Sequence, residues 1–74
     1  MNVLLFGVLA DVTGTSEMNM KAMDTDSLKK ELLSRFPMLS QYRFQFAVNK
    51  EQIRNNVSLS EADEVALLPP FAGG

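Results

Sequence analysis

The residues best suited to chemistry in this 74-residue sequence stand at its end, in the segment LLPPFAGG. Glycine contributes no side-chain packing and loses more conformational freedom on folding than any other residue, so Gly73 and Gly74 are poor material for a compact core. Their value is chemical, because a backbone without Cβ atoms can approach another molecule closely. The competing interpretation is an ordinary frayed terminus without a role.

The rest of the sequence lacks the side chains on which many enzymes depend. It contains no cysteine and no histidine, which removes thiol chemistry, disulfides, the commonest general base and the commonest metal ligand. We therefore expect no metal site and no stably bound cofactor. The net charge is −2 and the basic residues are scattered, so a nucleic-acid partner is not expected.

The length predicts one domain, residues 1–74, with a small core. The apolar N-terminal stretch MNVLLFGVLADVTG has no basic leader and is too short to span a bilayer, so we interpret it as a buried strand. Together with the absence of cysteine, this predicts a cytoplasmic protein that has no membrane partner.

Two strands are expected in the first third of the sequence. The run NVLLFGVL, residues 2–9, is continuously apolar, which is typical of a central strand. Turn-forming residues surround Gly14, and EMNMKAM, residues 17–23, then alternates between apolar and polar side chains. The short connection predicts an antiparallel hairpin. The methionines of this segment are expected in the core or on the sheet face: Met18, Met20 and Met23.

One helix is clear in DTDSLKKELLSRFP, where Asp24, Thr25 or Asp26 can cap the start and the final proline ends the helix. Its apolar stripe recurs every four residues: Leu28, Leu32 and Phe36. Beyond it, FQFAVN alternates, a short strand is expected near Ile53, and EVALL, residues 64–68, is the last strand.

The expected order is strand, strand, helix, strand, short strand, strand. One amphipathic helix covers one sheet face, which gives a two-layer α+β domain. The first and last strands are the most apolar, so we expect them side by side and parallel at the centre, with the helix in the crossover between them. This mixed sheet packed on one main helix is the β-grasp arrangement of ubiquitin.

The sequence resembles the small subunits of molybdopterin synthase, a family of ubiquitin-like sulfur carriers. The resemblance runs almost the whole length, through VLLFG, Gly14, the helix ending in RFP, FAVN and, most specifically, DEVALLPPFAGG. Two positions depart from the family pattern. Ala62 stands where a glycine usually precedes the aspartate, and Ala10 stands where a basic residue often follows the first strand.

The resemblance implies that Gly74 is the working residue. In this family an adenylating enzyme uses ATP to convert the terminal carboxylate to an acyl-adenylate, and a sulfur donor, a sulfurtransferase, displaces AMP to leave a thiocarboxylate. The sulfur then passes to a pterin precursor inside a complex with the large synthase subunit and becomes part of the molybdenum cofactor's dithiolene. The chain is accordingly expected to be the sulfur-donating subunit of a sulfurtransferase complex, without catalytic activity of its own.

The segment before the glycines is expected to present them to partners. Pro69 and Pro70 stiffen the exit from the sheet, and residues 70–74 are expected to form a flexible tail. A single helix leaves one sheet face open, so we expect a partner interface on that face near the root of the tail. Its expected contacts are Phe6, Pro70 and Phe71. A core position for Phe6, and a local cap on the core for Phe71, are the alternatives.

Two other functions remain open. A carrier for thiamin thiazole synthesis or another sulfur pathway would use the same chemistry with different partners, although the Pro-Pro pair favours the molybdopterin carrier. A ubiquitin-like interaction module would use no covalent chemistry at all. The intact mass after co-expression with an activating enzyme separates this module from both carriers.

Overall fold

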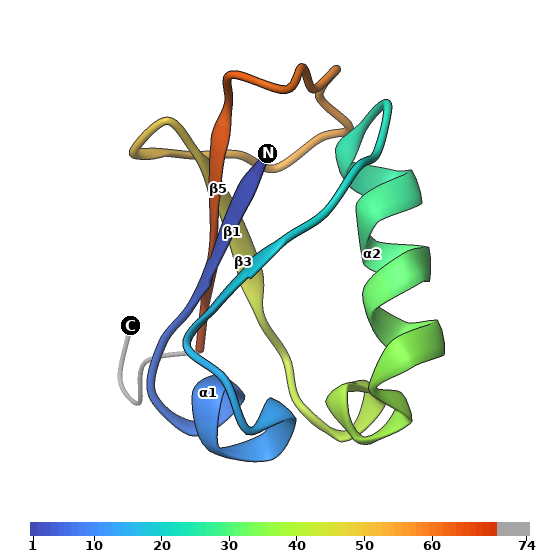
Figure 1. Cartoon of the computed structure of the whole chain (residues 1–74), viewed down its shortest axis with the longest axis vertical. Coiled ribbons are helices and arrows are strands. Elements are labelled where there is room, and N and C mark those ends of the chain that lie inside the picture. The colour runs from blue at the N-terminus through green and yellow to red at the C-terminus, as the bar shows by residue number, and fades with distance from the viewer. Residues whose placement is uncertain (70–74) are drawn as a thin grey trace.

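In the computed structural model, which describes residues 1–69, one five-stranded mixed sheet packs against one main helix (Figure 1). The strand order is β2-β1-β5-β3-β4. The elements in chain order are β1 (Asn2–Leu5), α1 (Val8–Thr13), β2 (Glu17–Asn19), α2 (Thr25–Arg35), the 3-10 helix η1 (Pro37–Gln41), β3 (Gln45–Val48), β4 (Glu51–Gln52) and β5 (Glu64–Leu68). The predicted α+β, β-grasp architecture is confirmed.

The first and last strands lie side by side at the centre of the sheet. β1 and β5 run parallel, with Leu5 beside Leu67, and each has an antiparallel neighbour on its other side. A parallel pair needs a long crossover, and α2 lies within it. The predicted central pair is therefore confirmed, and the segment that follows β5 leaves from the middle of the sheet.

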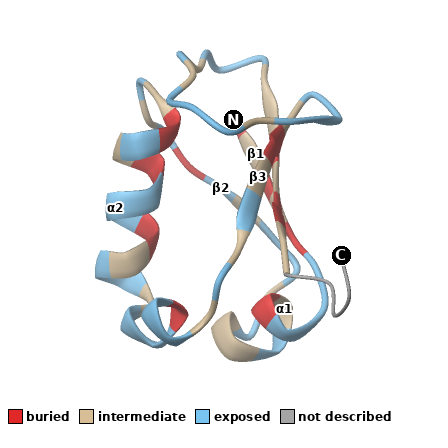
Figure 2. Ribbon diagram, turned by 180° about the vertical axis from the view of Figure 1, so that it is seen from behind, coloured by how far each residue is buried: buried red, intermediate tan, exposed pale blue. Residues whose placement is uncertain are grey.

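The core lies between the sheet and α2. Alternate residues of the central strands point toward the helix, and the buried residues of α2 face them (Figure 2). Phe44, Phe46 and Val48 pack on the same cluster. The fully or almost fully buried side chains include Val3, Leu5, Leu28, Leu32, Val65 and Leu67.

Local sequence signals define both ends of α2. Asp24 is the N-cap, and its carboxylate accepts a hydrogen bond from the Ser27 backbone N–H at 2.8 Å, which satisfies one of the free donors of the first turn. The helix ends at Arg35, two residues before Pro37. Arg35 also pairs with Glu31 at 3.1 Å, but both side chains are half exposed, so the pair adds little stability.

The expectation of one long first strand over residues 2–9 is wrong. β1 ends at Leu5, Gly7 has a φ of +56°, and Val8 begins the short helix α1. Glycine adopts this φ without steric cost, so the chain turns away from the sheet there. The helix buries Leu9 and ends at Gly14, whose φ is +78°. Val8 therefore belongs to a helix and not to the open sheet face.

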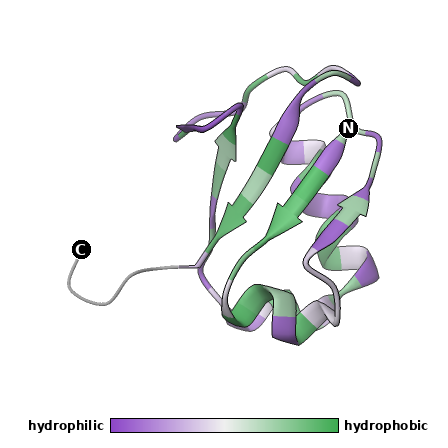
Figure 3. Ribbon diagram, turned by 60° about the vertical axis from the view of Figure 1, so that its left-hand side comes forward, coloured by the Kyte–Doolittle hydropathy of each residue, from purple (hydrophilic) through white to green (hydrophobic). Residues whose placement is uncertain are grey.

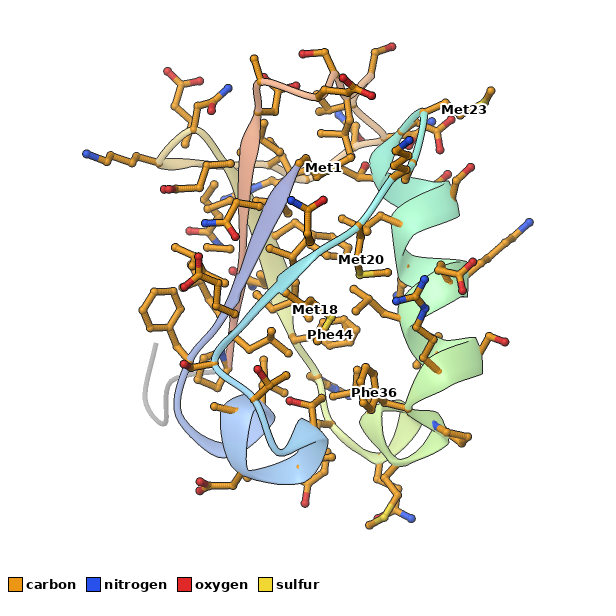
Figure 4. The ribbon with its side chains drawn as sticks, in the orientation of Figure 1. Met1, Met18, Met20, Met23, Phe36 and Phe44 are labelled. Atoms are coloured by element: carbon orange, nitrogen blue, oxygen red, sulfur yellow. The ribbon has the colours of Figure 1, made fainter. Side chains whose placement is uncertain are left out.

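The methionines of the second hairpin strand divide between the core and solvent. Met20 is buried and Met18 packs on the core, as predicted, but Met23 is 75% exposed. Figure 4 shows Met18 and Met20 between the sheet and α2, and Met23 pointing outward. The core or sheet-face expectation is wrong for Met23, because the two-residue alternation that packs Met18, Met20 and Ala22 on the core places residue 23 on the opposite side. The buried Leu39 of η1 is a core residue that the pattern did not predict.

Two tight turns complete the sheet. Asn49 and Lys50, between β3 and β4, both have positive φ, +51° and +72°, as a two-residue hairpin of type I′ requires. The turn before β5 places Ala62 at negative φ, so the glycine that the family pattern usually has there is not needed. None of the helices within residues 1–69 is long and apolar enough to cross a membrane.

Candidate functional site

The described residues contain only part of the predicted site. Phe6 lies at the end of β1, and Pro69 follows β5 directly. The predicted site residues Pro70, Phe71, Gly73 and Gly74 lie outside the described residues, as does the predicted flexible tail, 70–74. The structure thus shows the end of β5, from which the C-terminal segment starts, and the surface around it.

The end of β5, from which the C-terminal segment starts, is held in place because β5 is hydrogen-bonded on both sides. Leu67 lies beside Leu5 of β1 and opposite Phe46 of β3, and the pairing with β3 extends to Leu68. The side chain of Leu67 is fully buried. Strands in the middle of a sheet with buried side chains are among the last parts of a domain to open. The C-terminal segment therefore begins at a fixed point.

Beside this point the sheet presents apolar residues on the side away from α2. Side chains alternate along a strand, so Leu4, Ala66 and Leu68 point opposite to the buried Leu5 and Leu67. All three are half-buried, and the central strands that carry them are hydrophobic along most of their length (Figure 3).

Phe6 extends this set of residues. Its N–H donates to the Leu67 carbonyl at 3.3 Å, which continues the ladder of β1 by one residue and places the side chain on the face of Leu4. It is 46% exposed, so the structure supports the surface interpretation of Phe6 over the core interpretation. We call Leu4, Phe6, Ala66 and Leu68 the open apolar face.

Polar residues border the open apolar face. Glu17 of β2 lies beside Leu4 on one side, and Gln45 of β3 lies opposite Leu68 on the other. Both are exposed. An apolar centre with a polar rim is the usual arrangement of a protein–protein interface. The arrangement is suited to docking a partner beside the exit of the C-terminal segment.

The carboxylate of Asp63 has a structural role. Hydrogen bonds from Asn49 and from the Ser60 backbone N–H, at 2.9 and 2.8 Å, lower the pKa of Asp63 and hold the turn before β5. Within residues 1–69, no group of three or more Asp or Glu side chains is placed to bind a metal. The carboxylate of Asp63 therefore serves to hold a turn.

A surface hollow of about 440 Å³ opens between the start of α2 and the β3–β4 hairpin. Part of its polar lining is hydrogen-bonded within the domain. The Asn56 side-chain oxygen accepts hydrogen bonds from the Asp26 N–H at 2.9 Å and the Thr25 hydroxyl at 3.1 Å, and Thr25 in turn accepts from the Val57 N–H. These contacts tie the loop after β4 to the first turn of α2. The Thr25 and Asn56 side of the hollow therefore belongs to the capping of α2.

Comparison with solved structures defines the class of fold. The chain is similar to the solution structure of small archaeal modifier protein 1 from Methanosarcina acetivorans, with a TM-score of 0.84 and 22% identity over 99% of this chain and 94% of that one. It is also similar to a chain in the protein–protein complex of subunits 1 and 2 of molybdopterin-converting factor from Helicobacter pylori, with a TM-score of 0.75 and 29% identity over 99% and 96% of the two chains. The fold is the ubiquitin-like β-grasp.

The family follows from the sequence. The model of the ThiS family matches residues 3–74, and the chain belongs to that family. It is 31% identical over 77 residues to the molybdopterin synthase sulfur carrier subunit of Arabidopsis thaliana. This match covers 97% of this chain and 80% of the relative. The resemblance that the sequence motifs indicated is confirmed.

Proposed function

We propose that this protein is a sulfur carrier and acts as the small subunit of molybdopterin synthase. The observation that carries the proposal is the family match, which runs from the first strand through Gly74 and is accompanied by a relative named as a sulfur carrier subunit. The open apolar face beside the exit of β5 supports it, because a carrier must dock on partners that receive its terminus.

The proposed chemistry takes place at Gly74. A carboxylate is a poor electrophile, so an activating enzyme first joins one of its oxygens to the α-phosphate of ATP, and pyrophosphate leaves. The outer sulfur of a persulfide on the donor protein then attacks the carbonyl carbon, and the C–O bond to AMP breaks with its electron pair. A thiol next reduces the S–S bond that still joins this sulfur to the donor, and a disulfide forms on the donor's side. The product is a thiocarboxylate at Gly74, which later gives its sulfur to a pterin precursor.

The chain's own part in these steps is presentation. The sequence has no histidine and no cysteine, and it has no glycine-rich phosphate-binding loop, so the nucleotide and the attacking sulfur belong to the partners. The chain contributes a terminus without Cβ atoms at Gly73 and Gly74, which fits a narrow active site. It also contributes the open apolar face, which lies beside the end of β5.

The proposed partners use the open apolar face in turn. The activating enzyme must release the carrier before the large synthase subunit can receive it, and a surface of a few half-buried apolar side chains is suited to reversible binding. Phe6 is the aromatic residue of the open apolar face and is 46% exposed. Pro70 and Phe71 are proposed to extend the contact beyond the described residues.

The experiment compares the parent chain with two terminal variants in a reconstituted synthase reaction. One variant lacks Gly73 and Gly74, and the other carries one alanine after Gly74. Both are expected to retain the thermal midpoint of the parent, because glycine contributes no side-chain packing, and to form no molybdopterin. Synthase activity of the extended variant, with its extra residue shown by mass to be retained, would refute the proposal.

A carrier for thiamin thiazole synthesis remains the second candidate, because it would use the same activation of Gly74. The names of the curated relative and of the subunit complex favour molybdopterin synthase. The two functions separate by partner. We expect the thiocarboxylated chain to bind the large synthase subunit and convert the pterin precursor, whereas a thiazole carrier would do neither.

A further inference from the structure

We propose that Gly7 is a positioning residue, which fixes Pro69 and thereby the point from which the reactive terminus extends. The inference rests on the proposed function for its consequence, but its structural basis lies wholly within the described residues. Gly7 stands between β1 and α1, and Pro69 is the residue that follows β5. The two are far apart in the sequence and adjacent in space.

Gly7 occupies a turn that only glycine enters easily. Its φ is +56° and its ψ is −133°, and the Leu9 N–H donates to the Phe6 carbonyl at 3.1 Å. These are the features of a type II′ turn with glycine at the first central position. An L-residue with a side chain is strained in this region of φ and ψ.

The turn is anchored at both ends. On one side Phe6 donates to Leu67 of β5, and on the other the Gly7 carbonyl accepts from the Ala10 N–H at 3.1 Å at the start of α1. Leu9, the next residue but one, is fully buried. The backbone of Gly7 is therefore a rigid surface.

Pro69 rests on this surface. A Cβ atom built on Gly7 would lie 3.2 Å from Cγ of Pro69, which is closer than ordinary van der Waals contact. Proline has no N–H, so it cannot be held in the sheet by a ladder hydrogen bond. Packing of its ring against Gly7 replaces that bond, and the absence of a side chain at residue 7 is what permits the approach.

The position of Pro69 matters because Gly74 follows it by only five residues. Five residues reach at most about 17 Å, so Pro69 sets the centre of the volume that Gly74 can reach. Misplacing a reacting group by about 1 Å can cost a hundredfold in rate. Phe6, the neighbour of Gly7, belongs to the open apolar face. One turn therefore connects the surface that docks on partners to Pro69, where the C-terminal segment starts.

The test replaces Gly7 and measures both structure and reaction. Gly7→Ala introduces the close contact together with positive-φ strain. The matched control is Gly14→Ala, because Gly14 also has a positive φ, +78°, and nothing lies within 4 Å of the place that a Cβ atom would take there. Pro69→Ala removes the ring from the other side of the contact without straining residue 7, and the double variant Gly7→Ala/Pro69→Ala completes a cycle.

The first readout needs no reaction. In the parent and in Gly14→Ala, nuclear Overhauser contacts between the Gly7 Hα atoms and the Pro69 ring are expected, and in Gly7→Ala the Pro69 ring signals are expected to shift. Without these contacts in the folded parent, the proposed role of Gly7 is wrong whatever the function of the protein. If Gly7→Ala does not fold, the contacts in the parent and in Gly14→Ala still test the packing, and Pro69→Ala still tests its consequence for the reaction.

The second readout is adenylation of the carrier by its activating enzyme with ATP, measured as kcat and as KM for the carrier. We expect Gly7→Ala and Pro69→Ala each to lower kcat by about tenfold or more while KM changes less, since the docking face is kept. The double variant should be no worse than Pro69→Ala alone, and Gly14→Ala should match the parent. Equal kcat for Gly7→Ala and Gly14→Ala would overturn the inference, whereas a parent that is not adenylated at all would overturn the proposed function.

Discussion

Phe6→Ala tests whether Phe6 binds partners from the open apolar face or belongs to the core. The exposed 46% of the side chain corresponds to about 90 Å² of a phenylalanine's roughly 200 Å². At about 25 cal/mol per Å², covering that area on binding contributes about 2 kcal/mol, or about thirtyfold in affinity. We therefore expect Phe6→Ala to bind the large synthase subunit about thirtyfold more weakly than the parent.

The same substitution should leave the domain folded. Complete removal of a buried phenylalanine costs about 3–5 kcal/mol, and only about half of the Phe6 side chain is covered in the free domain, so a loss of about 2 kcal/mol or less of unfolding free energy is expected. Urea unfolding measures it beside the titration. Unfolding of Phe6→Ala at ambient temperature would show that Phe6 is a core residue.

Met23→Ala is the matched control for the titration. Met23 is also apolar and is 75% exposed, but it lies at the end of the sheet away from Pro69 and points outward (Figures 1 and 4). Isothermal titration should give the parent's affinity for Met23→Ala. Parent-like binding by Phe6→Ala, or a loss confined to Met23→Ala, contradicts the assignment of the open apolar face.

Three further predictions concern stability. Hydrogen bonds from Ser27 and Asn56 lower the pKa of Asp24 in the folded protein. The ionised carboxylate therefore stabilises the fold above the unfolded pKa near 3.8, and this stability is lost as the pH falls through the lower folded pKa. Asp24→Asn, which still caps the helix, should reduce the loss of stability that urea unfolding measures between about pH 5 and about pH 2. Lys50→Gly should raise the unfolding free energy by about 0.5–1 kcal/mol, because Lys50 has a φ of +72°, and a lower thermal midpoint would contradict this. Leu32→Ala, at a fully buried position, should lower the unfolding free energy by about 2–5 kcal/mol, and a loss below about 1 kcal/mol in calorimetry would mean that the core relaxes around the cavity.

The sequence was sufficient for the parts of the fold where one period dominates. Leu28 and Leu32 recur at helical spacing between Asp24, which caps, and a proline that ends the helix, and α2 has those limits. EVALL predicted β5 to the residue. The sequence also predicted a partner interface on the sheet face that the helix leaves open, and the structure places the half-buried Leu4, Ala66 and Leu68 and the 46% exposed Phe6 on that face.

The sequence was insufficient where one apolar run serves two elements. Residues 2–9 are apolar throughout, so periodicity could not show that β1 ends at Leu5 and that Leu9 is buried from a helix instead. The one available signal was Gly7 inside the run, which is typical of a turn or a close backbone approach. The contact of Gly7 with Pro69 joins residues from opposite ends of the chain, and no local pattern predicts such a contact.

The intact mass of the chain after incubation with its activating enzyme, ATP and a sulfur donor tests the central claim most directly. A sulfur carrier should gain the mass that corresponds to the exchange of one oxygen for one sulfur, located at Gly74 by fragmentation, and the variant that carries an extra alanine should gain none. An unchanged mass in the presence of an enzyme shown to thiocarboxylate another carrier, or a sulfur located on any other residue, would contradict the account.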